Sequence, residues 1–295
     1  AASDVYKRQP LDIRGEIPSA RWGHSLTSLR NKIGDNSCVQ RLAVLVGGRN
    51  ERELSNSAHL LSLVDADSPS DSGHFLWETI HFPSNLHQPI LPFHHASISI
   101  PSEDEEGQHN GRATIFVFGG VSNPANLLEA FGPPEPLVTS FTLDFESSHP
   151  YQAEVCSLQI PDDTAFDFGV GGAFTVLDCL TTPLMPAPEH RYLLLKSGGT
   201  PTNVPTHLQD GQSSYSCLQL LELSRHRRDD RDNIQWVLQP SSDAMAVIAI
   251  EGNPERSVMV HHQAVFVPSS PGCQSEVVLL GGGVMGFAFG PCFSK

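Results

Sequence analysis

A short apolar segment that ends in two glycines occurs four times along the 295-residue chain. The copies occupy residues 41–50, 113–122, 192–201 and 276–285. A short apolar run bounded by glycine indicates a strand that is buried on both faces. Glycine adopts positive φ without a Cβ clash, so each pair predicts a turn or a close approach to a neighbouring segment. Four such segments at similar spacing predict a structural repeat.

The composition favours strands and turns over helices. The chain has 24 Gly and 23 Pro, whereas charged residues make up only 17% of it. Such a composition is typical of folds with many short strands. No long stripe of apolar residues at helical spacing is present, so we predict an all-β fold.

Each glycine pair belongs to a larger predicted unit, which consists of an inner strand, the strand with the glycine pair, a third strand and a fourth that carries an aromatic residue. The predicted strands are residues 21–29, 42–46, 57–64 and 75–82; then 93–100, 114–118, 138–145 and 153–160; then 168–177, 191–196, 216–223 and 234–238; and finally 258–267, 277–280 and 284–293. Polar segments at 102–111 and 224–232 predict a loop and a turn. A four-stranded unit cannot bury both faces alone, whereas radial stacking of such units can, which predicts a β-propeller.

The glycine pair on the second strand and the Trp on the fourth resemble the kelch repeat, over about residues 17–290. The resemblance implies a kelch-type β-propeller with four recognisable blades, the fourth of them incomplete. The glycine pairs are 72, 79 and 83 residues apart, and the usual kelch period is about 50, so long loops are expected. The chain starts without Met, and we expect an internal piece of a longer protein. Residues 1–9 are interpreted as a non-native or disordered leader and residues 10–295 as one propeller.

The last part of the chain, VVLLGGGVMGFAFGPCFSK, is similar to the terminal kelch segment of the tRNA wybutosine-synthesizing proteins. In that family a glycine triplet, a short spacer and an aromatic-x-Phe-Gly run close the propeller. The matching positions here are Gly281, Gly282, Gly283, Phe287, Phe289 and Gly290. Gly286 departs from the family pattern, in which a small residue or Cys is expected at that place.

This resemblance implies that the segment is the accessory propeller of a tRNA-modifying enzyme. In the version of the family related to leucine carboxyl methyltransferases, a preceding domain uses S-adenosylmethionine to methylate the wybutosine precursor in phenylalanine tRNA. No glycine-rich loop between a strand and a helix is recognised here, so we expect no cofactor and no catalysis in this segment, and S-adenosylmethionine only in the parent chain. The alternative is a protein–protein interaction propeller of a scaffold or a ubiquitin-ligase adaptor, because kelch propellers serve many functions.

The net charge of −15 disfavours unaided binding of nucleic acid, since such a surface repels phosphate. Expected partners are therefore a protein or the parent chain's catalytic domain, with tRNA contacted only indirectly. The six cysteines form no C-x-x-C pair and are interpreted as reduced thiols. No signal peptide or apolar run of membrane-spanning length is recognised, which predicts a cytoplasmic protein without membrane contact.

Loops that leave the glycine pairs and loops that enter the inner strands are expected on one face of the propeller. The candidate binding face is formed by Arg21, His24, Arg49, Arg52 and His262. A local basic cluster on an acidic protein predicts a site for an acidic partner or a phosphate. No catalytic residue is assigned.

Three histidines occupy similar places in three inner strands, namely His24, His95 and His262. Hydrogen bonds between blades are the preferred interpretation, and a convergent metal site in the channel is the alternative. The three tryptophans, Trp22, Trp77 and Trp236, are predicted to be core residues between blades. Burial is also predicted for Phe116, Val117, Leu193 and Leu279.

Overall fold

The computed structural model describes fourteen segments of the chain. They are residues 11–29, 39–65, 73–82, 91–103, 109–122, 138–146, 153–160, 168–181, 190–199, 218–227, 234–241, 259–267, 276–286 and 290–293. Their regular structure consists of strands, and no helix occurs among them, which confirms the all-β prediction. The leader at residues 1–9 lies outside the described residues. The described residues also include no helical segment with the length and apolar character of a transmembrane helix.

Within these described segments, seventeen strands form four separate sheets, which are numbered in chain order. Sheet 1 contains β1 (Ile13–Gly15), β2 (Ser25–Ser28), β3 (Val39–Val46), β4 (Ala58–Val64) and β5 (His74–Ile80). Sheet 2 contains β6 (Ala96–Glu103), β7 (His109–Phe118), β8 (Val138–Asp144) and β9 (Glu154–Val155). Sheet 3 contains β10 (Ser157–Gln159), β11 (Ala173–Thr181), β12 (His190–Ser197), β13 (Leu218–Arg227) and β14 (Ile234–Pro240). Sheet 4 contains β15 (Met259–Val267), β16 (Glu276–Gly286) and β17 (Gly290–Phe293).

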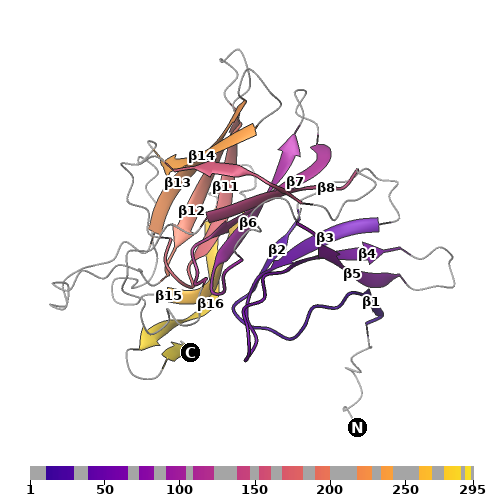
Figure 1. Ribbon diagram of the computed structural model, residues 1–295. Helices are drawn as coiled ribbons and strands as arrows, with labels where there is room; N and C mark the ends of the chain where they lie inside the picture. Colours follow the sequence, from indigo (N-terminus) through magenta and orange to yellow (C-terminus); the bar gives the residue numbers. More distant parts are fainter. Residues whose placement is uncertain are drawn as a thin grey trace, which may run out of the picture.

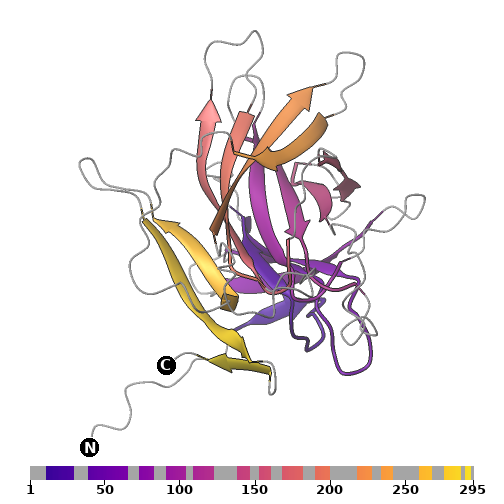
Figure 2. The same cartoon turned by 90° about the vertical axis from the view of Figure 1, so that its left-hand side faces the viewer.

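The sheets follow one another in space in the order in which they occur in the chain (Figure 1). The first strand of each repeat unit, not counting the short β1 and β10, is β2, β6, β11 or β15, and the strands that follow are counted from it. Contacts between these first strands run from β2 to β6, from β6 to β11 and from β11 to β15. Sheet 4 lies beside the first strand of sheet 3, with its outer side uncovered by the other sheets in the view of Figure 2. Each first strand is therefore the inner edge of its sheet.

Most predicted strands are observed close to their predicted positions, and the differences lie mainly in how short segments pair. Residues 153–160, predicted as one strand, split into β9, which pairs antiparallel with β8, and β10, which pairs parallel with β14 of the next sheet. The unpredicted strand β1 pairs parallel with β5 in the same way. Residues 224–227, predicted as part of a turn, extend β13 because they pair with β14. The last strand of sheets 1 and 3 thus receives a parallel strand from the segment that precedes the sheet.

The first three glycine pairs form turns, and the first two of these turns contact the next sheet. Both glycines of each pair have positive φ, between +56° and +93°. A Cβ on Gly47 would collide with the Pro92 carbonyl of the next sheet's approach segment, and a Cβ on Gly119 would collide with the carbonyl of Gly169. The amides of Gly48 and Gly120 donate hydrogen bonds to these same two carbonyls, at 3.2 and 3.1 Å. Glycine is therefore required both by the backbone conformation and by the close approach of the next sheet.

The fourth glycine segment differs from the prediction. Gly281, Gly282 and Gly283 lie within β16 rather than at its end, because β16 continues to Gly286 and pairs there with β17. Residues 287–289, which carry the two aromatic positions of the closing motif, lie outside the described residues. The strand predicted over residues 284–293 is replaced by this hairpin.

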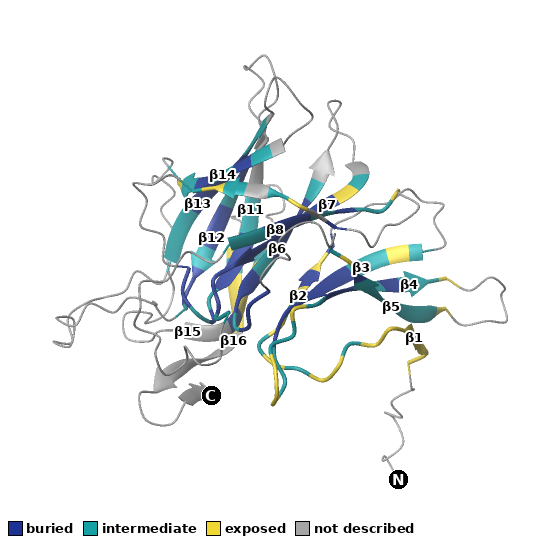
Figure 3. Ribbon diagram, viewed as in Figure 1, coloured by how far each residue is buried: buried dark blue, intermediate teal, exposed yellow. Residues whose placement is uncertain are grey.

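Two apolar clusters fill the spaces between sheets 1 and 2 and between sheets 2 and 3. Buried residues concentrate on the second and third strands of these sheets (Figure 3). Phe116 and Val117 are buried as predicted, whereas Leu193 is only half-buried and Leu279 is 36% exposed. The prediction for Leu279 is wrong because no described strand covers that part of sheet 4.

The three tryptophans also differ in environment. Trp236 is buried in the cluster between sheets 2 and 3, and Trp77 is half-buried. Trp22 is 46% exposed, so its prediction as a core residue is wrong. It lies before β2, where its ring packs on Phe93 at 5.5 Å between centroids rather than between two sheets.

Candidate binding cleft

A cleft of about 720 Å³ lies between the first strands of the four sheets. This volume falls in the range of small-molecule and peptide sites. Its walls come from four segments of equivalent position in the repeat. They are residues 22–28 with β2, residues 94–99 with β6, residues 171–176 with β11 and residues 262–266 with β15. None of these lining residues is Asp, Glu, Lys or Arg.

The strand register places the three predicted histidines at equivalent positions. In sheet 1, Ser25 pairs with the last residue of the second strand, and His24 comes directly before Ser25. In sheet 2, Ala96 has the same place, and His95 comes directly before Ala96. In sheet 4, His262 itself pairs with Gly281. Gly172 occupies this place in sheet 3. A histidine is therefore found at three of the four equivalent positions around the cleft.

Two of these histidines connect one sheet to the next. His95 Nε2 and Ser25 Oγ form a hydrogen bond of 2.8 Å that joins sheet 2 to sheet 1. His262 Nε2 and Ser197 Oγ form a bond of 2.8 Å that joins sheet 4 to the second strand of sheet 3. Both histidine side chains are buried. Both histidines thus form the hydrogen bonds between neighbouring units of the repeat that the preferred interpretation expects, here between neighbouring sheets.

A row of hydroxyl groups continues the joint between sheets 1 and 2. Ser97 Oγ donates a 2.6 Å hydrogen bond to Ser25 Oγ and also bonds Thr27 Oγ1. Ser99 Oγ donates a 2.7 Å hydrogen bond to the carbonyl of Ser28. The strands β2 and β6 are thus joined through side-chain hydroxyls. Sequence reasoning missed this row, although Ser and Thr at alternate positions of both inner strands could have indicated it.

Burial keeps His95 neutral at physiological pH. It lowers the pKa of His95 from its ordinary 6.5 to about 4, with a partial opposing effect from the Pro92 carbonyl and smaller lowering effects from His24 and His94. Burial, followed by the charge of Arg21, also lowers the pKa of His24. His24 and His95 therefore present neutral imidazole groups to the cleft at physiological pH, beside the hydroxyl groups of the joint.

The five residues of the predicted binding face are only partly brought together. His24 and His262 line the cleft, whereas the three arginines do not. The guanidinium of Arg49 lies 5.1 Å from the centre of the Trp22 ring and 5.2 Å from that of Phe93, which is cation–π geometry. Arg21 donates hydrogen bonds to the Gly47 carbonyl and to Ser57, at 3.2 and 2.9 Å.

The fifth residue, Arg52, lies on an exposed turn. Its backbone amide donates a 2.8 Å hydrogen bond to Asn50 Oδ1. Arg21 and Arg49 are thus engaged in holding the segment that enters β2 against the first glycine turn. They border the cleft as structural contacts, and Arg52 is the arginine of this group whose side chain is exposed.

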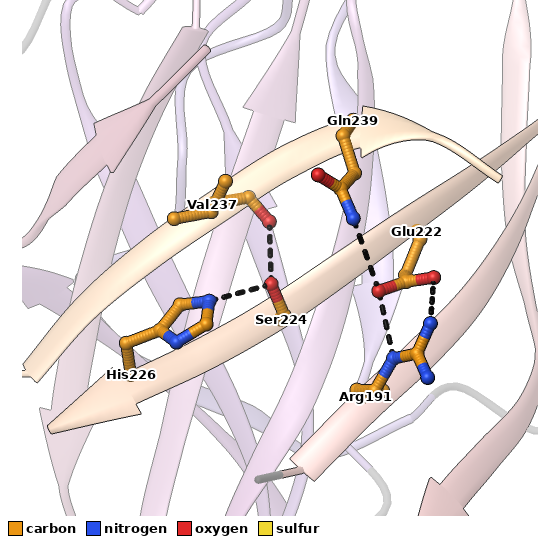
Figure 4. A network of polar contacts seen from close by, with 6 residues as sticks. All are labelled: Arg191, Glu222, Ser224, His226, Val237 and Gln239. Atoms are coloured by element: carbon orange, nitrogen blue, oxygen red, sulfur yellow. Dashed lines mark hydrogen bonds and ion pairs between the residues drawn. The ribbon is translucent and has the colours of Figure 1, made fainter. Parts of the chain in front are cut away.

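A second polar cluster lies on sheet 3, on the face turned away from sheet 2 (Figure 4). The Arg191 guanidinium binds both carboxylate oxygens of Glu222, with Nε donating to Oε1 at 2.7 Å. Gln239 donates a 3.3 Å hydrogen bond to the same Oε1. Ser224 Oγ and His226 Nε2 are hydrogen-bonded at 3.0 Å. The buried carboxylate is therefore neutralised by the bidentate ion pair, which holds β12 to β13.

The cleft suits binding of a neutral polar group better than chemistry on a substrate. Its hydroxyl and imidazole groups bond largely to each other across the sheet joints. Among the described residues, no group of three His, Cys, Asp or Glu side chains is arranged to hold a metal ion. Comparison with protein-family models finds no matching family, and comparison with curated proteins finds no matching relative. Interpretation of the cleft therefore rests on its geometry and on the repeat itself.

Proposed function

We propose that the chain is a kelch-type β-propeller that acts as the accessory, non-catalytic propeller of a tRNA wybutosine-synthesizing protein. The observation that carries the fold proposal is the repeated joint between sheets. The first two glycine pairs, at equivalent positions, each pack against the approach segment of the following sheet. Sheets joined in sequence through their inner strands are typical of propeller blades.

The assignment to tRNA modification is carried by the closing motif. The glycine triplet 281–283 and Gly290 match the terminal kelch segment of the wybutosine-synthesizing proteins. In the structure these glycines belong to the paired strands β16 and β17. In such a protein the propeller contributes a binding platform, and S-adenosylmethionine and methyl transfer belong to the catalytic domain of the parent chain in the cytoplasm.

The platform would contact tRNA indirectly. The net charge of −15 opposes the phosphate interactions that dominate affinity for nucleic acid, and none of the described residues that line the cleft carries a charge to offset it. A protein partner or the catalytic domain is the better match to an uncharged cleft. The propeller would then hold that partner near the tRNA.

The test is to delete residues 10–295 from the intact enzyme. We expect wybutosine in phenylalanine tRNA to fall, while S-adenosylmethionine binding by the remaining catalytic domain is retained in calorimetry. The isolated segment should neither bind S-adenosylmethionine nor methylate a tRNA precursor. Unchanged wybutosine after the deletion would reject the assignment to tRNA modification.

Arg52 and Arg49 allow a second test of the binding face. If an acidic partner binds there, Arg49→Ala with Arg52→Ala should weaken binding to the intact partner, and Arg14→Ala is a matched control because Arg14 pairs with Asp12 away from the cleft lining. Loss of binding in the pair but not in the control supports a contact at this face. Equal affinity for all three proteins would remove both arginines from the site.

The second candidate function is a scaffolding or substrate-recognition propeller. The observation that favours it is the same uncharged cleft, which suits a protein segment as well as it suits a catalytic domain. The sequence that precedes this segment in the intact protein discriminates between the two candidates. A methyltransferase domain supports the first, and a BTB domain supports the second.

A further inference from the structure

Three hydroxyl groups at the joint of sheets 1 and 2 form a compact cluster in the wall of the cleft. Ser97 Oγ lies 2.6 Å from Ser25 Oγ and is also bonded to Thr27 Oγ1, so one oxygen holds the other two close together. All three residues line the cleft, and Ser25 and Ser97 are half-buried. The strands on the two sides of this joint are β2 and β6, so the cluster does not depend on what adjoins sheets 1 and 4 on their outer sides.

The direction of these hydrogen bonds determines what the cluster offers to a ligand. A hydroxyl group has one hydrogen to donate and two lone pairs that accept. Ser97 donates its hydrogen to Ser25, so the hydrogen in the Thr27–Ser97 bond comes from Thr27. Both hydrogens are therefore used inside the cluster, while one lone pair of Ser97 and both lone pairs of Thr27 remain to accept.

His95 takes up the hydrogen of Ser25. Burial lowers the pKa of His95, and the Pro92 carbonyl opposes this effect as a hydrogen-bond acceptor. Because Nε2 is occupied by Ser25, the proton of the neutral ring is assigned to Nδ1, and Ser25 donates to Nε2 at 2.8 Å. The chain of bonds thus runs in one direction, from Thr27 through Ser97 and Ser25 to His95. The cluster presents oxygen lone pairs to the cleft and no hydroxyl hydrogen.

Such a cluster favours an uncharged ligand that donates hydrogen bonds. An anion would meet lone pairs instead of donors, and the net charge of −15 opposes its approach. A cation would meet no carboxylate among the described residues that line the cleft, and the positive charge of Arg21 acts on His24 in the same wall. A neutral donor is the class that remains.

The spacing of the oxygens distinguishes a sugar from a peptide. The N–H groups on one side of an extended peptide recur at every second residue, about 7 Å apart, so only one of them can reach a cluster this compact. Neighbouring hydroxyl groups of a sugar stand on adjacent carbon atoms, so two of them can donate to neighbouring oxygens of the cluster at the same time. The cleft volume of about 720 Å³ accommodates a ligand of this size.

A strained histidine lies in the same wall of the cleft. His94 has a φ of +57°, whereas sheets 1 and 3 place glycine at the equivalent position, namely Gly23 at +66° and Gly171 at +73°. A residue with a Cβ is strained in this left-handed conformation, and such strain is typical of functional sites. His94 lines the cleft and directly precedes His95, where the chain of hydroxyl bonds ends. Sheet 2 thus keeps an imidazole where the backbone favours glycine.

We propose that the cleft binds a neutral sugar, with neighbouring hydroxyl groups of the sugar donating to the oxygens of Ser25, Ser97 and Thr27 and with the ring of His94 in contact with the sugar. The site goes beyond the proposed platform role and does not depend on the assignment to tRNA modification. A failure of sugar binding would leave the deletion experiment on wybutosine unaffected, and the reverse also holds.

The test is an NMR titration of the purified, isotopically labelled chain with glucose, galactose, mannose and ribose, and with the amine and acid analogues of each hexose. We expect saturable shifts of the amide signals of cleft residues with at least one neutral sugar. Its charged analogues should bind at least about tenfold more weakly, because each brings a charge into a cleft without a partner for it. A glycan array then distinguishes a free sugar from a sugar chain carried by a protein, and either source fits the site.

Three variants locate the site. Thr27→Val keeps the shape of the side chain but removes its lone pairs, so affinity should fall about fivefold. Thr114→Val is the matched control, because Thr114 forms a similar hydroxyl pair with Thr142 away from the cleft lining, and it should leave affinity unchanged. His94→Asn should also weaken binding, since Asn tolerates the left-handed conformation but lacks the ring. Circular dichroism checks that all three variants are folded.

An unaltered chain that binds none of the neutral sugars overturns the proposal, including a chain that binds an uncharged Gly-Ser peptide instead. So does tighter binding of the charged analogues, or unchanged affinity in both Thr27→Val and His94→Asn. An equal loss of affinity in Thr27→Val and Thr114→Val would also reject the site at the hydroxyl cluster.

Discussion

Acid should weaken the joint between sheets 1 and 2 through His95. Burial lowers the pKa of this imidazole from 6.5 to about 4, whereas the unfolded chain keeps the ordinary value. Above pH 6.5 both states carry neutral His95, so its contribution to stability is fully present. As pH falls from 6.5 toward 4 the unfolded state binds a proton that the folded state does not, and the free energy of unfolding decreases.

The size of the effect follows from the two pKa values. They differ by about 2.5 pH units, and each unit corresponds to about 1.4 kcal/mol, so His95 accounts for a loss of roughly 3 kcal/mol by pH 4. This is a large part of the stability of a typical domain. The loss would open the Ser25–His95 hydrogen bond and with it the inner edge of the joint.

The assay is urea unfolding at several pH values between 7.5 and 4 for the unaltered chain, His95→Gln and His81→Gln. Gln retains a hydrogen-bonding group near Ser25 but does not titrate, so the acid-dependent loss should be about 3 kcal/mol smaller in His95→Gln. His81 is exposed, so His81→Gln should follow the unaltered chain. Equal pH dependence of all three proteins, or an NMR titration of His95 near 6.5, would refute the reasoning.

Three further predictions concern stability and are measured by urea unfolding at neutral pH. Gly119→Ala should lower the free energy of unfolding by about 1–3 kcal/mol, because φ is +67° and a Cβ would collide with the Gly169 carbonyl. Gly172→Ala should lower it less because Gly172 has no positive φ, and equal losses would contradict the turn argument. Phe116→Ala should lower the free energy of unfolding by about 3–5 kcal/mol and Leu279→Ala by less than about 1 kcal/mol, since Phe116 is fully buried and Leu279 is 36% exposed. A large loss of stability for Leu279→Ala would mean that sheet 4 is covered in solution. Arg191→Ala should lower the free energy of unfolding by about 3–5 kcal/mol, because it leaves the buried Glu222 carboxylate uncompensated. Adding Glu222→Gln to the same chain should recover part of this loss, and strict additivity of the two changes would argue against their coupling.

The strands were predictable because their signals are local. Apolar runs that end in glycine pairs define the second strand of each of the first three sheets, and the turns there need glycine for a reason that sequence alone supplies. The equivalence of His24, His95 and His262 was also predictable, since each lies in the first strand, or just before it, ahead of a strand that leads into a glycine segment.

The pairing of short strands was not predictable. Strands β1 and β10 have three residues each and carry no distinctive pattern. Their parallel pairing with β5 and β14 depends on the path of the chain in three dimensions, which the local sequence does not indicate. The exposure of Trp22 has the same origin. The sequence predicts that an apolar residue before the first strand is buried in the core, but such a residue is buried only if another sheet covers it.

The arginines of the candidate site show a further limit. Composition and position suggest a basic binding cluster, because nothing in the sequence reveals what an arginine touches. In the structure Arg49 packs on Trp22 and Phe93, and Arg21 bonds the first glycine turn. These two arginines therefore hold the segment that leads into β2 in place. The predicted basic binding cluster loses them as free binding groups.

The two fully described joints solve one geometric problem with different side chains, which explains why the third repeat is the hardest to recognise. At the joint of sheets 1 and 2, His95 fits against Gly47 and Gly120, and Ser25 supplies its hydrogen-bond partner. At the joint of sheets 2 and 3, Phe168 fits against Gly119 instead, and Phe118 stacks on Phe174 with ring centres 4.5 Å apart. The glycine pair has the same role in both joints, because in each case the backbone of the segment that enters the next sheet lies close to it. The neighbouring positions only have to fill the remaining space, with hydrogen-bonded polar groups or with aromatic rings. A repeat of this kind keeps its backbone contacts while its side chains diverge, so its glycines identify the fold and its joints determine stability and pH response.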